Sequence, residues 1–162
     1  MNYVNILLPD VKWNTKSVGL FLSLLVLPNL LGMINLSTGF GFNVHFFQIA
    51  IFIAAFIYGP KGGLLSGLFG SAYSAMAMGN PYIVVGNCIL GLVTGLFAKK
   101  FNAMAVGLAF MVQLPWLVAT DYYLIHMPLP VITLLVISLA LSNLIWALVA
   151  SKMTGHIKGM LA

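Results

Sequence analysis

Residues 54–70 read AAFIYGPKGGLLSGLFG, two apolar runs on either side of the break Gly59-Pro60-Lys61-Gly62-Gly63. Proline has no backbone N–H to donate and glycine leaves the helical conformation easily, so a Gly-Pro pair is a turn signal. We therefore expect one helix to end at Tyr58 and the next to begin at Gly62. Lys61 is the only charged residue of this stretch, which indicates that both helices lie in an apolar environment.

Similar apolar runs, separated by turn residues, fill most of the chain on both sides of this break. A helix needs about 20 residues to cross the hydrocarbon core, and shorter helices are accommodated by local bilayer thinning. The runs that approach this length are residues 17–36, 44–58, 62–78, 82–98, 103–120 and 131–150. We predict an all-α membrane protein, a compact bundle of six transmembrane helices. It forms a single transmembrane domain over residues 1–162 and lies in the plasma membrane as a multi-pass protein.

The composition favours the same class. Hydrophobic residues make up 62% of the chain and charged residues only 6%, too few charges to cover a water-soluble protein of this size. The formal net charge of +5 comes from isolated lysines rather than from a basic patch, so we expect no nucleic-acid partner. Cys88 is the only cysteine, which excludes a disulfide within the chain.

The lysines support the six-helix count and predict its orientation. If six helices alternate in direction, all the lysines fall on one side of the membrane, and the opposite side carries one charge, that of Asp121. Lysine is enriched in cytoplasmic loops, so this pattern predicts that both chain termini are cytoplasmic. The residues on this side are Lys12, Lys16, Lys61, Lys99, Lys100, Lys152 and Lys158.

Glycines at helical spacing predict where the helices pack most closely. Gly63, Gly67 and Gly70 form one small-residue face, and Gly91 and Gly95 form another. In lipid, helices associate by close packing of their backbones, which small residues permit. We expect the helices of residues 62–78 and 82–98 to form the centre of the bundle.

Residues 54–70, followed by Gly86 and by Gly91-Leu92-Val93-Thr94-Gly95-Leu96, resemble the substrate-binding (S) subunits of energy-coupling factor (ECF) transporters, a type of ABC transporter. In that family one helix ends at a Gly-Pro and the next opens with spaced glycines. A later helix carries Gly-x-x-x-Gly before a basic cytoplasmic turn. The resemblance extends over residues 17–150 and agrees with the six-helix count.

This resemblance implies high-affinity binding and uptake of a vitamin or related micronutrient. It implies two kinds of partner, a transmembrane coupling subunit and two cytoplasmic ATPases. We expect no enzymatic activity and no cofactor in this chain, which lacks a Gly-x-x-x-x-Gly-Lys-Ser/Thr phosphate loop. The family contacts its coupling subunit through small residues on the first helix. Gly19 and Ser23 are the nearest match here, and packing within the subunit is the alternative role.

Polar side chains in the predicted spans are the candidates for ligand binding, because such groups in a membrane tend to face a cavity or a partner. Most are amides, whose donors and acceptors suit a heterocycle, and each could instead bond a neighbouring helix. An aromatic ring could stack on such a ligand while Asp121 pairs with a positive group. We predict a neutral or cationic heterocycle bound by Asn35, Asn43, His45, Asn87, Gln113, Trp116, Asp121, Tyr122 and Asn143.

Three other functions are alternatives to this one. His45, His126 and Asp121 could converge on a metal, as in a nickel/cobalt-type uptake subunit. Members of that type carry a histidine near the N-terminus, where this chain reads Met1-Asn2-Tyr3-Val4, so we predict no metal site. A non-transporting six-helix scaffold of the rod-shape protein type would need no ligand. A channel would need a continuous polar path, which isolated amides do not provide.

Overall fold

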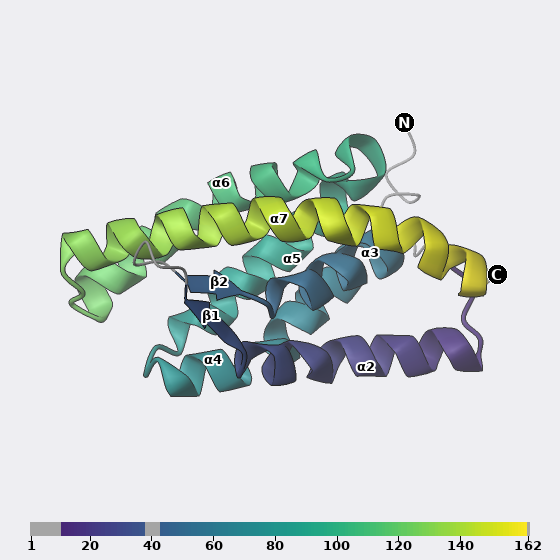
Figure 1. The fold of residues 1–162 in the computed structure, drawn as a ribbon, viewed down its shortest axis with the longest axis horizontal. Coiled ribbons are helices and arrows are strands. Elements are labelled where there is room, and N and C mark those ends of the chain that lie inside the picture. The colour runs from purple at the N-terminus through teal and green to yellow at the C-terminus, as the bar shows by residue number, and fades with distance from the viewer. Residues whose placement is uncertain (1–10, 38–42, 162) are drawn as a thin grey trace.

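The computed structural model describes residues 11–37 and 43–161, without the side chains of residues 35–37 and 43. In Figure 1, α2 runs along one edge of the molecule and α6 and α7 along the opposite edge, with α3 and α5 between them. The elements in chain order are α2 (Thr15–Gly32), β1 (Asn35–Ser37), β2 (Asn43–His45), α3 (Gln48–Gly70), α4 (Ala72–Ala77), α5 (Tyr82–Phe101), α6 (Met104–Ala119), the π-helix η1 (Thr120–Leu124) and α7 (Leu129–Leu161).

Five helices in the described part of the chain are long and apolar enough to cross a membrane. They are α2, α5, α7, the combined run Gln48–Ala77 and the combined run Met104–Leu124. Helix α2 exposes 56% of Leu22, 58% of Val26 and 54% of Leu30, an apolar face that suits lipid rather than water. The prediction of apolar membrane-spanning helices is therefore confirmed. The predicted spans 44–58 and 62–78 both fall largely within the run Gln48–Ala77.

Helix α3 reverses direction at Gly59, whose backbone angles of φ 69° and ψ −157° are not helical. A β-carbon placed on Gly62 would lie 2.8 Å from Ala54 O, and one on Gly63 would lie 2.9 Å from the Ala55 β-carbon. Residues eight positions apart in a straight helix are about 12 Å apart, so these contacts require the chain to fold back. Residues 48–58 and 60–70 are thus two antiparallel helical segments, and the predicted break at Gly-Pro is where they meet.

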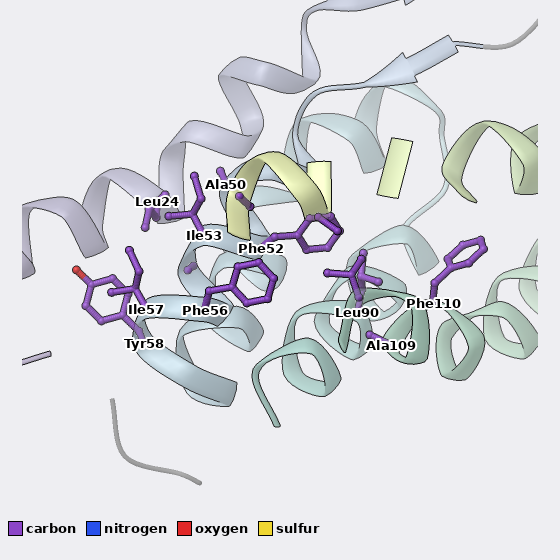
Figure 2. Packing of buried hydrophobic residues seen from close by; sticks show 14 of the residues in the cluster. Leu24, Ala50, Phe52, Ile53, Phe56, Ile57, Tyr58, Leu90, Ala109 and Phe110 are labelled. Carbon is purple, nitrogen blue, oxygen red and sulfur yellow. The ribbon is translucent and has the colours of Figure 1, made fainter. Parts of the chain in front are cut away.

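Glycines bring α3 and α5 into direct backbone contact. A β-carbon on Gly63 would collide with Gly91 O, and one on Gly95 would lie 2.5 Å from the Pro60 α-carbon. Every residue from Ala50 to Pro60 is buried, so the segment 48–58 is the core around which the other helices pack. Figure 2 shows side chains from α2, α3, α5 and α6 gathered between the helices of this core. The predicted close packing of the glycine-rich helices is present, but the most buried segment is 48–58 rather than the helices of residues 62–78 and 82–98.

Strands β1 and β2 form an antiparallel pair between α2 and α3, in which Asn35 lies opposite His45. Only helices were predicted for this region, so these two three-residue strands are an addition to a fold that is otherwise helical. Ser142 Oγ lies 3.1 Å from His45 N and accepts its hydrogen bond, and Trp146 Nε1 donates to His45 O at 2.8 Å. Both partners belong to α7. The backbone N–H and C=O of His45 therefore both have partners within the protein, as an apolar environment requires.

The lysines lie at one end of the bundle. Asn14 Nδ2 donates to Leu161 O at 3.0 Å, so the start of α2 meets the end of α7 (Figure 1). Tyr58, which precedes the Gly59 reversal, donates its hydroxyl to Ser17 O at 2.6 Å. The end of α5 packs against the same reversal. We call this region the basic end; its residues are Lys12, Lys16, Lys61, Lys99, Lys100, Lys152 and Lys158.

Candidate functional site

A cavity of about 250 Å³ lies at the end of the bundle opposite the lysines. It is enclosed by α4, the start of α5, the end of α6, η1 and the first turns of α7, with β2 contributing His45. We call it the aromatic cavity because Tyr73, Tyr82 and Trp116 line it. The predicted ligand-binding residues that line it are His45, Asn87, Gln113, Trp116 and Asp121. These come from β2, α5, α6 and η1, so the fold brings distant candidates to one place.

Asp121 is the one carboxylate among the residues that line this cavity. Its side chain is only 3% exposed, and Asn80 Nδ2 donates to Asp121 Oδ1 at 2.7 Å. One neutral hydrogen bond leaves most of the acceptor capacity of a carboxylate unused. Asp121 lies in the π-helix η1, a helix type that is frequent at functional sites. The cavity therefore offers a buried acceptor for a positive or hydrogen-donating group.

The aromatic rings of the cavity are held in fixed positions. Trp116 Nε1 donates to Tyr82 O at 3.1 Å, and the Trp116 and Tyr82 rings meet edge to face with centroids 6.4 Å apart. Tyr73 approaches from the start of α4, and its backbone N–H donates to Asn29 Oδ1 at 2.9 Å. Rings held in this way present faces on which a planar ligand can stack without first being ordered.

Two amides reach the cavity from neighbouring helices. Asn87 Nδ2 donates to Ser71 Oγ at 2.8 Å, which fixes the orientation of that side chain. Gln113 is 5% exposed, and a β-carbon on Gly86 would lie 3.2 Å from Gln113 Nε2. Gly86 therefore provides the space in which the Gln113 amide lies. Together the two side chains supply donors and acceptors suited to the edge of a heterocycle.

Several predicted site residues lie elsewhere. Asn35 and Asn43 belong to β1 and β2, but their side chains fall outside the described residues. Tyr122 is 41% exposed and does not line the aromatic cavity. Asn143 is buried in α7 outside the cavity lining, and its amide has no hydrogen-bond partner among the described residues.

The predicted partner-contact residues lie on the exposed face of α2. Ser23 Oγ donates to Gly19 O at 2.9 Å within the helix. A β-carbon on Gly19 would have no heavy atom within 4 Å among the described residues. Among residues 11–37 and 43–161, neither residue packs against another helix, so this face of α2 is open there.

No three His, Cys, Asp or Glu side chains gather closely enough to hold a metal ion in the part of the chain that the structure describes. His45 and Asp121 line the aromatic cavity, but His126 does not.

Sequence reasoning missed Tyr73, Asn80 and Tyr82 as cavity residues. Asn80 and Tyr82 flank Pro81 in the turn before α5, and Tyr73 follows the glycine-rich segment of α3. Their position, next to turns at the same end of the bundle as Asp121, was the sequence signal that could have identified them as cavity residues.

Comparisons of the chain with protein-family models, with curated proteins and with solved structures found no match.

Proposed function

We propose that this chain is the substrate-binding subunit of an ECF-type transporter and binds a neutral or cationic heterocycle in the aromatic cavity. The observation that carries the proposal is the composition of this cavity. It combines a buried carboxylate, three amides and the four rings of Phe47, Tyr73, Tyr82 and Trp116 at the end of the bundle that has no lysine. Few, well-placed polar groups in a mostly apolar cavity are characteristic of small-molecule sites.

The chemistry of the lining favours the ligand class. No lysine or arginine lines the aromatic cavity, so a carboxylate or phosphate group would have no cationic partner there. Asp121 would pair with a positive or donor group, and the aromatic faces would stack on a ring. The volume of about 250 Å³ suits a compound of vitamin size rather than a peptide or a lipid.

The orientation that we propose has six crossings, with both termini in the cytoplasm. The reversal at Gly59 supports counting residues 48–58 and 60–77 as separate passes. The gathering of the lysines at one end supports a cytoplasmic basic end. The aromatic cavity would then open toward the outside, where an uptake protein meets its substrate.

Partners would supply the energy for transport. We assign the contact with a transmembrane coupling subunit to the exposed face of α2 around Gly19 and Ser23, where another helix could approach closely. ATP hydrolysis would belong to two cytoplasmic ATPases bound to that subunit.

A ligand screen tests the proposal directly. The purified protein is mixed with individual vitamins and ring-containing micronutrients, and its thermal denaturation is followed. A true ligand should raise the denaturation temperature increasingly with concentration, because binding to the folded state stabilises it by mass action. Co-purification of a coupling subunit and ATPases should accompany this result. A protein that no candidate stabilises and that co-purifies with cell-wall proteins would instead be a scaffold.

The orientation has its own test. A membrane-impermeant amine reagent added to intact cells should leave Lys61 and Lys99 unmodified, whereas permeabilised cells should show both modified. Modification of either lysine from outside would overturn the proposed topology and the outward-facing cavity with it.

A further inference from the structure

A second cavity of about 250 Å³ lies at the basic end, between α3, α5 and α7. We call it the basic cavity. Phe56 forms apolar lining, and the polar lining residues are Lys99, Asn102, Ser151, Thr154 and Lys158. The aromatic cavity shares none of these residues, so the two cavities are separate.

The charge around the basic cavity is positive. Two ammonium groups line it, and none of its lining residues is acidic. Lys99 and Lys158 each also make an interaction with another group. Lys100 and Lys152 lie on the same end, and the only acidic residue in the described ranges 11–37 and 43–161 is Asp121 at the opposite end. The full chain has seven lysines and two aspartates, so the lysines leave this end net positive even with the second aspartate counted against them, and an anion is attracted to it.

The donors match a phosphate group. Lysine ammonium groups are strong phosphate ligands, and the amide of Asn102 and the hydroxyl of Ser151 provide further N–H and O–H donors. Thr154 Oγ1 donates to Ala150 O at 2.7 Å, so its own proton is already used. Asn102 follows the end of α5 with φ 49°. This backbone turn brings its side chain to the cavity beside Lys99.

We propose that the basic cavity binds the phosphate of an anionic phospholipid headgroup in the leaflet at the basic end. Basic pockets between transmembrane helices on the cytoplasmic side are suited to such headgroups, and juxtamembrane lysines are attracted to anionic lipid. Free inorganic phosphate offers the same chemistry and is the other source that the test must separate. The proposal does not depend on the ligand of the aromatic cavity.

The experiment compares lipids by native mass spectrometry and thermal denaturation. Purified protein is titrated with phosphatidylglycerol, and separately with phosphatidylcholine of the same acyl chains. Phosphatidylglycerol should bind more tightly and raise the denaturation temperature more. The double variant Lys99→Gln/Lys158→Gln should lose roughly tenfold in phosphatidylglycerol affinity, and added salt should weaken the wild-type preference.

The control variant is Lys12→Gln/Lys16→Gln, which removes the same charge from the same end without touching the cavity lining. It should keep most of the preference for phosphatidylglycerol. Equal losses in both double variants would overturn the proposal, because they would indicate a diffuse charge effect. If inorganic phosphate alone stabilises the wild type but not Lys99→Gln/Lys158→Gln, the site binds free phosphate and the lipid assignment falls. If Lys99→Gln/Lys158→Gln does not fold, the wild-type protein alone tests the proposal. A preference for phosphatidylglycerol over phosphatidylcholine that added salt leaves unchanged would then overturn it.

Discussion

The aromatic cavity and the basic cavity have the same volume, about 250 Å³, but opposite chemistry. One has a buried carboxylate beside four aromatic rings, and the other has two ammonium groups beside two hydroxyls and an amide. One cavity lies at each end of the bundle, and the side chains that line it determine which class of ligand it can bind. In the proposed orientation, the same few charged residues would set both the direction of the chain relative to the membrane and the ligand class that each cavity favours.

Both cavities depend on the backbone contact between α3 and α5, so breaking that contact should have the largest effect. A β-carbon at Gly63 would meet Gly91 O, and backbone cannot move aside cheaply. Gly63→Ala should lower the free energy of unfolding by roughly 1–3 kcal/mol and weaken ligand binding at both ends. Thermal denaturation in detergent measures the loss. Gly19→Ala is the control, because it adds the same methyl group where space is open; equal destabilisation by both would contradict the packing argument.

The next largest effect should come from removing the charge of the aromatic cavity. Asp121→Asn keeps an oxygen that can accept the hydrogen bond from Asn80, but it removes the negative charge. Calorimetry should show that a cationic ligand binds roughly 10- to 100-fold more weakly. Lys158→Gln, a charge change in the basic cavity, should leave this affinity unaltered. Unchanged binding by Asp121→Asn would mean that the bound compound is neutral at that position.

Two amide replacements compare an amide that lines the aromatic cavity with one that is buried elsewhere. Gln113→Leu should weaken ligand binding by about tenfold, because a buried polar group of the ligand loses its partner. Asn143→Leu should leave ligand affinity nearly unchanged, since Asn143 does not line the aromatic cavity. Binding titrations on both variants measure the difference. A large loss with Asn143→Leu and none with Gln113→Leu would show that the ligand lies deeper, beside α7.

The smallest predicted effect tests how the Gln113 amide is accommodated. In Gly86→Ala the new methyl group would lie 3.2 Å from Gln113 Nε2 and 3.6 Å from Trp116 Cδ1. The amide must shift by a few tenths of an ångström, so affinity should fall by roughly two- to fivefold. The same titration measures it, and phosphatidylglycerol binding at the basic cavity should not change. An increase in affinity would indicate that the amide does not contact the ligand.

Much of the helical fold was predictable, because its signals are local. Apolar runs identified the long helices, and Gly59-Pro60 marked the position where the chain reverses. The β1–β2 hairpin was missed because its strands have three residues each and its turn-forming residues resemble an ordinary loop. The bonds that hold it come from Ser142 and Trp146, nearly a hundred residues away. No local pattern in residues 35–45 contains that information.

The site was predictable by residue type but not by helix face. Asn87 and Asn143 are both asparagines in apolar helices, yet only Asn87 lines the aromatic cavity. Helix α7 is apolar around its whole circumference, so periodicity could not say which way Asn143 points. The bond between Asn80 and Asp121 joins residues 41 positions apart and depends on how η1 meets the turn before α5. Such contacts follow from packing, which a single sequence does not specify.

The reversal at Gly59 has a consequence for how the protein is made. Residues 48–58 form a helix of about 16 Å, roughly half the thickness of the hydrocarbon core. A segment this short, with no lipid-facing surface because residues 50–60 are all buried, is poorly suited to partition into the bilayer by itself. In the six-crossing arrangement proposed above, it would enter together with residues 60–77 as one helical hairpin. The two segments would then insert as a single unit, with Lys61 at the cytoplasmic tip.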